Sequence, residues 1–160
     1  FQQIATGHPS FATIHSENLQ KLIDRLTSPP ISLPESLIGS LDIIVFIQRI
    51  RHKEKFVRKV TEVIEMLGMP KGEKMPIVNY VFRWDPFKDV FEIGEKSVIL
   101  KRISQTTGLS EKDVIDEFQR RVAILKWMKE KNIINFKDVY TIISAYYTMP
   151  NRFLALIESE

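Results

Sequence analysis

Residues 42–66 read DIIVFIQRIRHKEKFVRKVTEVIEM, and this stretch decides the expected fold class. Residues 43–47 are an unbroken run of aliphatic and aromatic side chains, which predicts a buried strand. Residues 49–55 are mostly charged and predict a solvated turn. The alternation over residues 56–66 predicts a strand that returns beside the first. This alternation is imperfect, so it leaves the register open.

Two helices are expected on the N-terminal side of this stretch. Ser16 is the expected N-cap of the first, and residues 28–30 (Ser-Pro-Pro) end it because proline cannot continue a helix. Pro34 suits the first turn of a second, short helix. Residues 11–15 have a strand-like makeup, so a short strand is expected there. The apolar face of the first helix follows the i, i+3, i+4, i+7 spacing: Leu19, Leu22, Ile23 and Leu26.

On the C-terminal side, residues 77–84 and 90–93 predict a β-hairpin. We therefore expect an α/β fold with three parts: residues 1–74, the hairpin within residues 75–94, and a helical subdomain over residues 95–160. The few strands of the first part make a poor sheet by themselves, because parallel strands need neighbours and covering helices. We interpret that part as the C-terminal end of a larger, here incomplete, sheet.

The helical subdomain carries clear capping signals. Gly108 closes a first helix, and Ser110 with Asp113 has the form of a capping box for the next. Asn135 is the expected cap of the last major helix, and Pro150 ends it. The long middle helix shows an apolar stripe: Val114, Ile115, Phe118, Val122, Leu125 and Met128.

Composition narrows the possible functions. The chain has 160 residues, of which 44% are hydrophobic and 27% charged, as in an ordinary globular protein. It contains no cysteine, which excludes a disulfide scaffold and a cysteine nucleophile. The net charge of +3 is small, and no apolar run approaches the ~20 residues that span a bilayer. Residue 1 is Phe, so we expect the chain to begin inside a longer or processed polypeptide.

Two histidines are the first candidates for chemistry. His8 follows Gly7 on an expected loop, and His15 lies where the expected strand meets the first helix. Strand ends and helix N-termini hold anions in α/β proteins, so a histidine there can donate to a phosphate oxygen. A partly exposed loop histidine without a ligand is the alternative. A metal pair is not favoured, and no phosphate loop of the G-x-x-x-x-G-K-[ST] type occurs.

A basic run over residues 49–59 has two interpretations. It can contact nucleic acid or acidic lipid, or it can be a solvated turn between two strands. We favour the solvated turn, because alternation along a strand would place Arg58 and Lys59 on opposite faces.

Several motifs in order resemble one family. Thr6-Gly7-His8 and residues 12–18 (ATIHSEN) are similar to the histidine box of secretion ATPases of the type II and type IV pilus class. Further segments of the chain resemble the archaeal branch of this class, which drives archaellum and pilus assembly. These segments are residues 22–34, 81–86, 120–128 and 142–147. The resemblance covers essentially the whole chain.

The resemblance implies the C-terminal portion of a RecA-like motor domain from a hexameric ATPase. It implies ATP and Mg²⁺ as cofactors of the complete protein, with the phosphate loop and catalytic glutamate upstream, so the 160 residues alone are expected to be inactive. It implies His15 as the residue that contacts the γ-phosphate region, His8 as its support, and Gly7 as the residue that permits the tight backbone path.

The same resemblance implies three partners: other copies in a homohexamer, the upstream part of the ATPase, and a membrane platform protein. It implies a cytoplasmic protein at the inner face of the membrane and no nucleic-acid partner. Two alternatives remain open. One is a noncatalytic docking or oligomerisation module, and the other is a basic nucleic-acid binder that uses residues 49–59.

Overall fold

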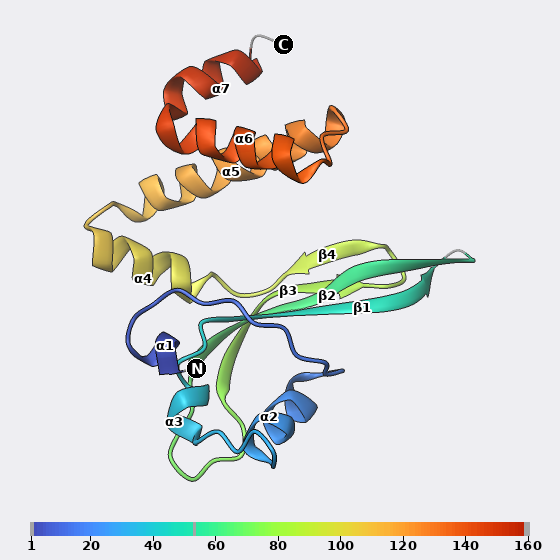
Figure 1. The fold of residues 1–160 in the computed structure, drawn as a ribbon, viewed down its shortest axis with the longest axis vertical. Coiled ribbons are helices and arrows are strands. Elements are labelled where there is room, and N and C mark those ends of the chain that lie inside the picture. The colour runs from blue at the N-terminus through green and yellow to red at the C-terminus, as the bar shows by residue number, and fades with distance from the viewer. Residues whose placement is uncertain (1, 53, 159–160) are drawn as a thin grey trace. The chain divides into compact units, whose positions relative to one another are not determined.

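The computed structural model describes residues 2–52 and 54–158 (Figure 1). Within these ranges the chain forms four strands and seven helices, which confirms a mixed α/β fold. It divides into two compact units, Phe1–Arg102 and Ile103–Glu160, which are described separately below.

The first unit is built on a four-stranded antiparallel sheet. Its strands are β1 (Ile43–His52), β2 (Lys55–Gly68), β3 (Ile77–Asp85) and β4 (Val90–Ile93). Each pairs with the next along the chain, in the order β1-β2-β3-β4. The predicted return of β2 beside β1 and the predicted hairpin are confirmed. The hairpin strands β3 and β4 extend the same sheet. All three strand pairs are antiparallel, so the reasoning from parallel strands that lack neighbours was wrong.

The prediction that residues 43–47 form a buried strand is wrong for one face. Ile44 and Phe46 are buried, whereas Ile43, Val45 and Ile47 are 50%, 47% and 63% exposed. Side chains alternate across a strand, and α2 packs against the face of β1 that carries Ile44 and Phe46. The unbroken apolar run therefore marks a strand with one covered face.

The predicted turn over residues 49–55 is also wrong. β1 continues to His52 and β2 begins at Lys55, so the charged residues lie in paired strands. Charged side chains are compatible with strands here because a two-stranded ribbon leaves both of its faces open to water. A register shift between Phe46 and Ile47 accommodates one extra residue of β2, Thr61.

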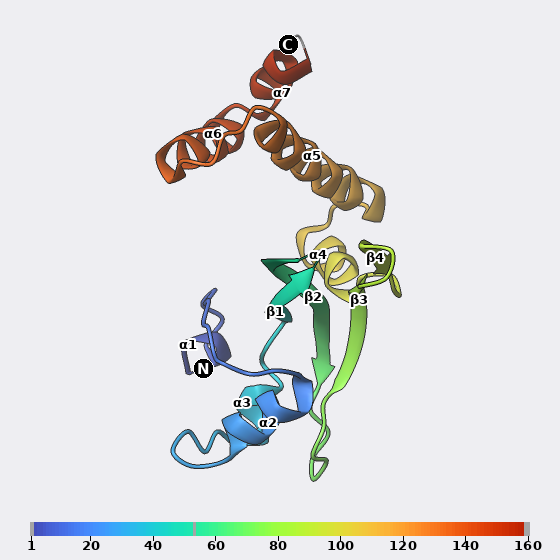
Figure 2. The ribbon, with the colours of Figure 1, turned by 90° about the vertical axis from the view of Figure 1, so that its right-hand side faces the viewer.

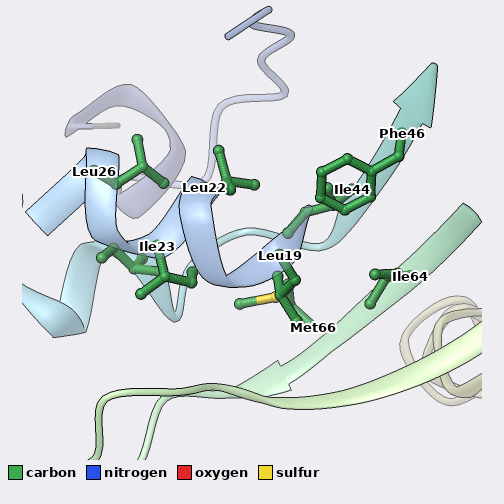
Figure 3. Packing of buried hydrophobic residues seen from close by; sticks show 9 residues of the cluster. Leu19, Leu22, Ile23, Leu26, Ile44, Phe46, Ile64 and Met66 are labelled. Carbon is green, nitrogen blue, oxygen red and sulfur yellow. The ribbon is translucent and has the colours of Figure 1, made fainter. Parts of the chain in front are cut away.

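Two helices cover one face of the sheet (Figure 2). They are α2 (Leu19–Thr27) and α3 (Glu35–Ile38). The predicted apolar face of α2 is confirmed, and Figure 3 shows its side chains against those of β1 and β2. The buried residues of this cluster are Leu19, Leu22, Ile23, Leu26, Ile38, Ile44, Phe46, Ile64 and Met66. This core fixes α2 beside β1, where the histidine segment also lies.

The N-cap of α2 is Asn18 and not Ser16. The Asn18 side chain accepts a hydrogen bond from the amide of Lys21 at 2.9 Å, whereas the Ser16 hydroxyl donates to the Asn18 carbonyl. A cap must lie directly before the first helical residue, which is Leu19. Ser28 forms the other end, as predicted.

A buried carboxylate connects the sheet to α4 (Val98–Thr107). Glu65 on β2 is 3% exposed and accepts hydrogen bonds from the amides of Val98 and Ile99, at 2.7 and 3.4 Å. It also accepts from the Ser97 hydroxyl and from the Asn79 amide on β3. Helix N-termini carry unpaired amides and partial positive charge, so this carboxylate both caps and anchors α4.

The second unit contains α5 (Glu111–Glu130), α6 (Phe136–Thr148) and α7 (Pro150–Glu158). The predicted capping box of Ser110 and Asp113 is confirmed, and Asn135 caps α6 as predicted. Trp127 and Phe153 meet edge to face, with ring centroids 6.2 Å apart. The buried residues of this small core are Ile124, Met128 and Tyr146.

The predicted apolar stripe of α5 is only partly buried. Val114 and Met128 are buried, but Ile115, Phe118 and Leu125 are exposed, and Ile124 is buried in their place. α6 and α7 pack against the C-terminal half of α5. In that half, the buried α5 side chains are the ones that face these two helices. Ile115, Phe118 and Leu125 therefore stay exposed.

A buried tyrosine of α6 donates a hydrogen bond to a carboxylate of α5. The Tyr146 hydroxyl lies 2.7 Å from Glu117, which also pairs with Arg120 and Arg121. Partial burial raises the pKa of the Glu117 carboxyl, but the Tyr146 hydrogen bond and Arg121 outweigh it and lower the pKa below its ordinary value. Glu117 therefore favours its ionised form in the folded state.

We expect acid to destabilise the second unit through Glu117. The pKa of Glu117 is lower in the folded state than in the unfolded state, where it is near 4.5. Ionised Glu117 therefore stabilises the fold at pH values above the unfolded pKa. This stabilisation is lost as the pH falls through the folded pKa. Urea unfolding followed by Tyr146-dependent near-ultraviolet signal at several pH values measures this. Glu117→Gln should flatten the dependence below pH about 4.5, and an unchanged slope in that variant would contradict the assignment.

Candidate functional site

The predicted site residues lie in the segment that joins α1 (Gln2–Ala5) to α2. The strand predicted over residues 11–15 is absent, because this segment pairs with no strand among the described residues. The segment runs extended and exposed, and side chains from other elements fix its course. His15 therefore precedes a helix but does not follow a strand.

Gly7 makes the turn that ends α1. Its φ is +84°, a left-handed conformation that glycine adopts without a steric penalty. The amides of Gly7 and His8 donate to the carbonyls of Ile4 and Gln3, at 2.9 and 3.0 Å. This turn determines where His8 leaves α1.

His8 is held by a neighbouring hydroxyl. Its Nδ1 lies 3.1 Å from the Thr6 hydroxyl, which donates its own proton to the Gln3 carbonyl at 2.9 Å. A hydroxyl has one proton, so Nδ1–H of His8 is the donor in this pair. This contact engages Nδ1 within the loop itself, which suits a supporting role.

His15 has a fixed backbone and an exposed ring. Its carbonyl accepts a hydrogen bond from Arg25 of α2 at 2.8 Å. Two residues further on, the Glu17 carbonyl accepts one from Gln48 of β1 at 3.0 Å. Across the residues that the structure describes, no hydrogen bond engages the His15 imidazole, so the ring can donate to an added group. Glu17 also pairs with Lys21, and this contact lowers the pKa of its carboxyl.

The structure places His15, but not His8, at a groove. The groove has a volume of about 640 Å³ and runs between residues 12–16, α2 and the edge strand β1. Its polar lining includes His15, Ser16 and Arg25, and the rest is largely apolar. No contact between His8 and His15 is formed within the described ranges. Sequence reasoning missed Arg25 and Gln48, because both act on backbone carbonyls that no motif marks.

The described residues lack two further features. No group of three His, Asp or Glu side chains there is close enough to hold a metal ion. Within the same residues, no helix is long and apolar enough to cross a bilayer.

Loss of Arg25 should loosen the histidine segment without unfolding the sheet. Arg25→Ala removes a charge-assisted hydrogen bond worth about 1.5 kcal/mol, so proteolytic cleavage within residues 12–17 should become several-fold faster. Limited proteolysis read by mass spectrometry tests this, with Gln20→Ala as the matched control, because the Gln20 side chain donates its hydrogen bond to Asp24 of the same helix. Equal cleavage rates in the Arg25 variant and the control would show that Arg25 does not fix the segment.

The comparisons found relatives in one archaeon, Methanocaldococcus jannaschii. Uncharacterized protein MJ1287 is 35% identical over 147 residues, which are 91% of this chain and 54% of that protein. Uncharacterized protein MJ0900 is 32% identical over 151 residues, 92% of this chain and 27% of the relative. Uncharacterized protein MJ0781 is 24% identical over 146 residues, which are 91% of this chain and 20% of that protein. No family model matches.

The chain thus spans about half the length of one of these relatives and smaller parts of the other two. In each case nearly the whole chain aligns. Its sequence therefore corresponds to a segment that occurs in proteins of different total length.

Proposed function

We propose that this chain is the histidine-box and C-terminal portion of a RecA-like, hexameric ATPase that drives assembly of a pilus, an archaellum or a secretion apparatus. The observation that carries the proposal is His15: its carbonyl is held by Arg25, its ring is exposed, and it borders a groove beside the start of α2. This arrangement suits a residue that reports on an anionic ligand. The similarity to parts of longer archaeal proteins agrees with a portion of a larger machine.

The residues present fit one phosphate contact and not a complete nucleotide site. The His15 imidazole can donate to a phosphate oxygen through a ring N–H. No cluster among the described residues suits Mg²⁺, so the proposal assigns the metal, the phosphate loop and the catalytic glutamate to the preceding polypeptide. Mg-ATP would supply the free energy for movement. The helical elements would transmit that movement to a neighbouring subunit or a membrane platform protein.

A second candidate function is noncatalytic docking, and the second unit supplies its observation. Several large apolar side chains on α5 and α6 are exposed: Ile115, Phe118, Leu125, Ile143 and Tyr147. Three of them border a groove of about 190 Å³, whose lining is almost wholly apolar. Monomeric proteins rarely leave such patches uncovered, so this surface suits a protein partner.

Leu125→Ser with Tyr147→Ser should weaken assembly of the complete protein. Both side chains border the small groove and are exposed, so the second unit should keep its own fold. We expect at least a tenfold rise in the dissociation constant between subunits, measured by sedimentation velocity. Tyr140→Ser, an exposed tyrosine of α6 outside the groove, is the control. Unchanged assembly in the double variant would show that this surface does not hold the subunits together.

A further inference from the structure

Charge in this chain is concentrated on one ribbon. Residues 48–59 carry six Lys and Arg and one Glu, a formal +5, whereas the whole chain carries +3. The remaining residues therefore sum to −2. The ribbon consists of the paired ends of β1 and β2 beyond the point where β3 pairs with β2 (Figure 1).

The strand register gathers three arginines on one face of this ribbon. Arg49 lies opposite Arg58, and Arg51 lies opposite Phe56. Because side chains alternate along a strand, these four share a face, while Lys59 points to the other side and pairs with Asp89. The predicted separation of Arg58 from Lys59 is thus confirmed, but three arginines still share one face.

The positions of these arginines lower the stability of the folded sheet. Like charges directly opposite each other in a sheet are destabilising, and Arg49 faces Arg58. Within the described residues, neither they nor Arg51 pair with a carboxylate, in contrast to Arg83, Arg102, Arg120 and Arg121. Arg49 lies over the Phe56 ring at 4.5 Å. Unpaired guanidinium groups suit phosphate oxygens, which they contact through two hydrogen bonds.

The same face also carries exposed apolar side chains. Val45 and Ile47 precede Arg49 and Arg51 in one row along β1, and Phe56 is 64% exposed. A nucleic acid would contact the arginines through its phosphates and stack its bases on Phe56. It would make no comparable contact with the apolar side chains of Val45 and Ile47. The interface of a phospholipid bilayer accommodates both, with apolar groups at the acyl boundary and cations among the headgroups.

We propose that the face formed by Val45, Ile47, Arg49, Arg51, Phe56 and Arg58 binds the surface of a membrane that contains anionic phospholipids. The proposal rests on the proposed function only for the presence of a membrane beside the protein. It names the part of the chain that contacts that membrane. Binding requires no nucleotide, so it is measured separately from ATP chemistry.

Vesicle sedimentation of the complete protein tests the proposal. We expect binding to vesicles of phosphatidylcholine mixed with phosphatidylglycerol, weakening with salt, and little binding to phosphatidylcholine alone. Replacing Arg49, Arg51 and Arg58 by Gln should lower the apparent affinity about fivefold per arginine, on the order of a hundredfold together. The fold should persist, because the change relieves the Arg49–Arg58 repulsion; thermal unfolding checks this.

Two control variants distinguish binding by this face from a general effect of the protein's net charge. Lys112, Lys126 and Lys137, all exposed in the second unit, are replaced by Gln for the same loss of charge, and binding should remain close to wild type. Val45→Thr with Ile47→Ser should weaken binding while its salt dependence stays unchanged. Equal losses in the arginine and lysine variants would overturn the proposal. So would binding to duplex DNA, lost in the arginine variant, with none to anionic vesicles.

Discussion

His15→Ala should reduce Mg-ATP turnover by the complete protein by about 10²- to 10³-fold, the loss expected when one preorganised donor to a developing charge is removed. The ring borders the groove and is exposed, while Arg25 fixes only the backbone. The substitution therefore removes the imidazole and leaves its support in place. Apparent affinity for ATP should change less than kcat, because under the proposed function the preceding phosphate loop would hold the nucleotide.

Two variants make the His15 prediction specific. His15→Gln keeps an N–H donor at a similar reach and should recover part of the activity. His8→Ala should cost less than His15→Ala, because His8 lies off the groove and its Nδ1 is engaged by Thr6. Turnover and filament assembly that are unchanged in His15→Ala would remove the proposed role of the histidine.

Glu65→Ala should destabilise the first unit by at least about 1–3 kcal/mol, the usual cost of one buried donor left without an acceptor. The carboxylate is buried and accepts from the α4 amides of Val98 and Ile99 and from Asn79. Alanine would leave these donors unpaired away from water, and each unpaired donor costs about 1–3 kcal/mol. The substitution also creates a cavity beneath α4.

Urea unfolding and hydrogen exchange measure this effect and its location. Glu65→Gln keeps one acceptor oxygen and should cost less than the alanine variant. Glu62→Gln, on the same strand, removes an ion pair with the largely exposed Arg83 and should cost less than about 1 kcal/mol. Exchange should rise first in the amides of α4. An unfolding midpoint equal to wild type in Glu65→Ala would show that this carboxylate does not anchor the helix.

Local signals predicted much of the fold. The apolar face of α2, the capping box at Ser110 and the cap at Asn135 were all predictable, because each depends on residues within one or two turns. The hairpin of β3 and β4 was predictable because Asp85-Pro86 separates two strand-like runs. Spacing and turn chemistry determine such features without reference to the rest of the chain.

Features that depend on distant partners were missed. The apolar run at residues 43–47 does not reveal which face of its strand a helix covers. Charge at residues 49–52 does not exclude a strand when both faces of the ribbon are solvated. Glu65 resembles an ordinary strand residue, and only the amides of α4, more than thirty residues later, explain its burial. Arg25 was missed for the same reason, since its acceptor is a backbone carbonyl.

Mg-ATP hydrolysis by the 160-residue chain and by the complete protein shows whether this chain is one portion of a motor. The chain's folded state is first verified by circular dichroism. We expect no turnover by the chain alone and turnover by the complete protein, reduced by His15→Ala. Turnover by the chain alone would contradict the assignment of the phosphate site to the preceding polypeptide. The absence of turnover in both would contradict the motor and favour the docking function.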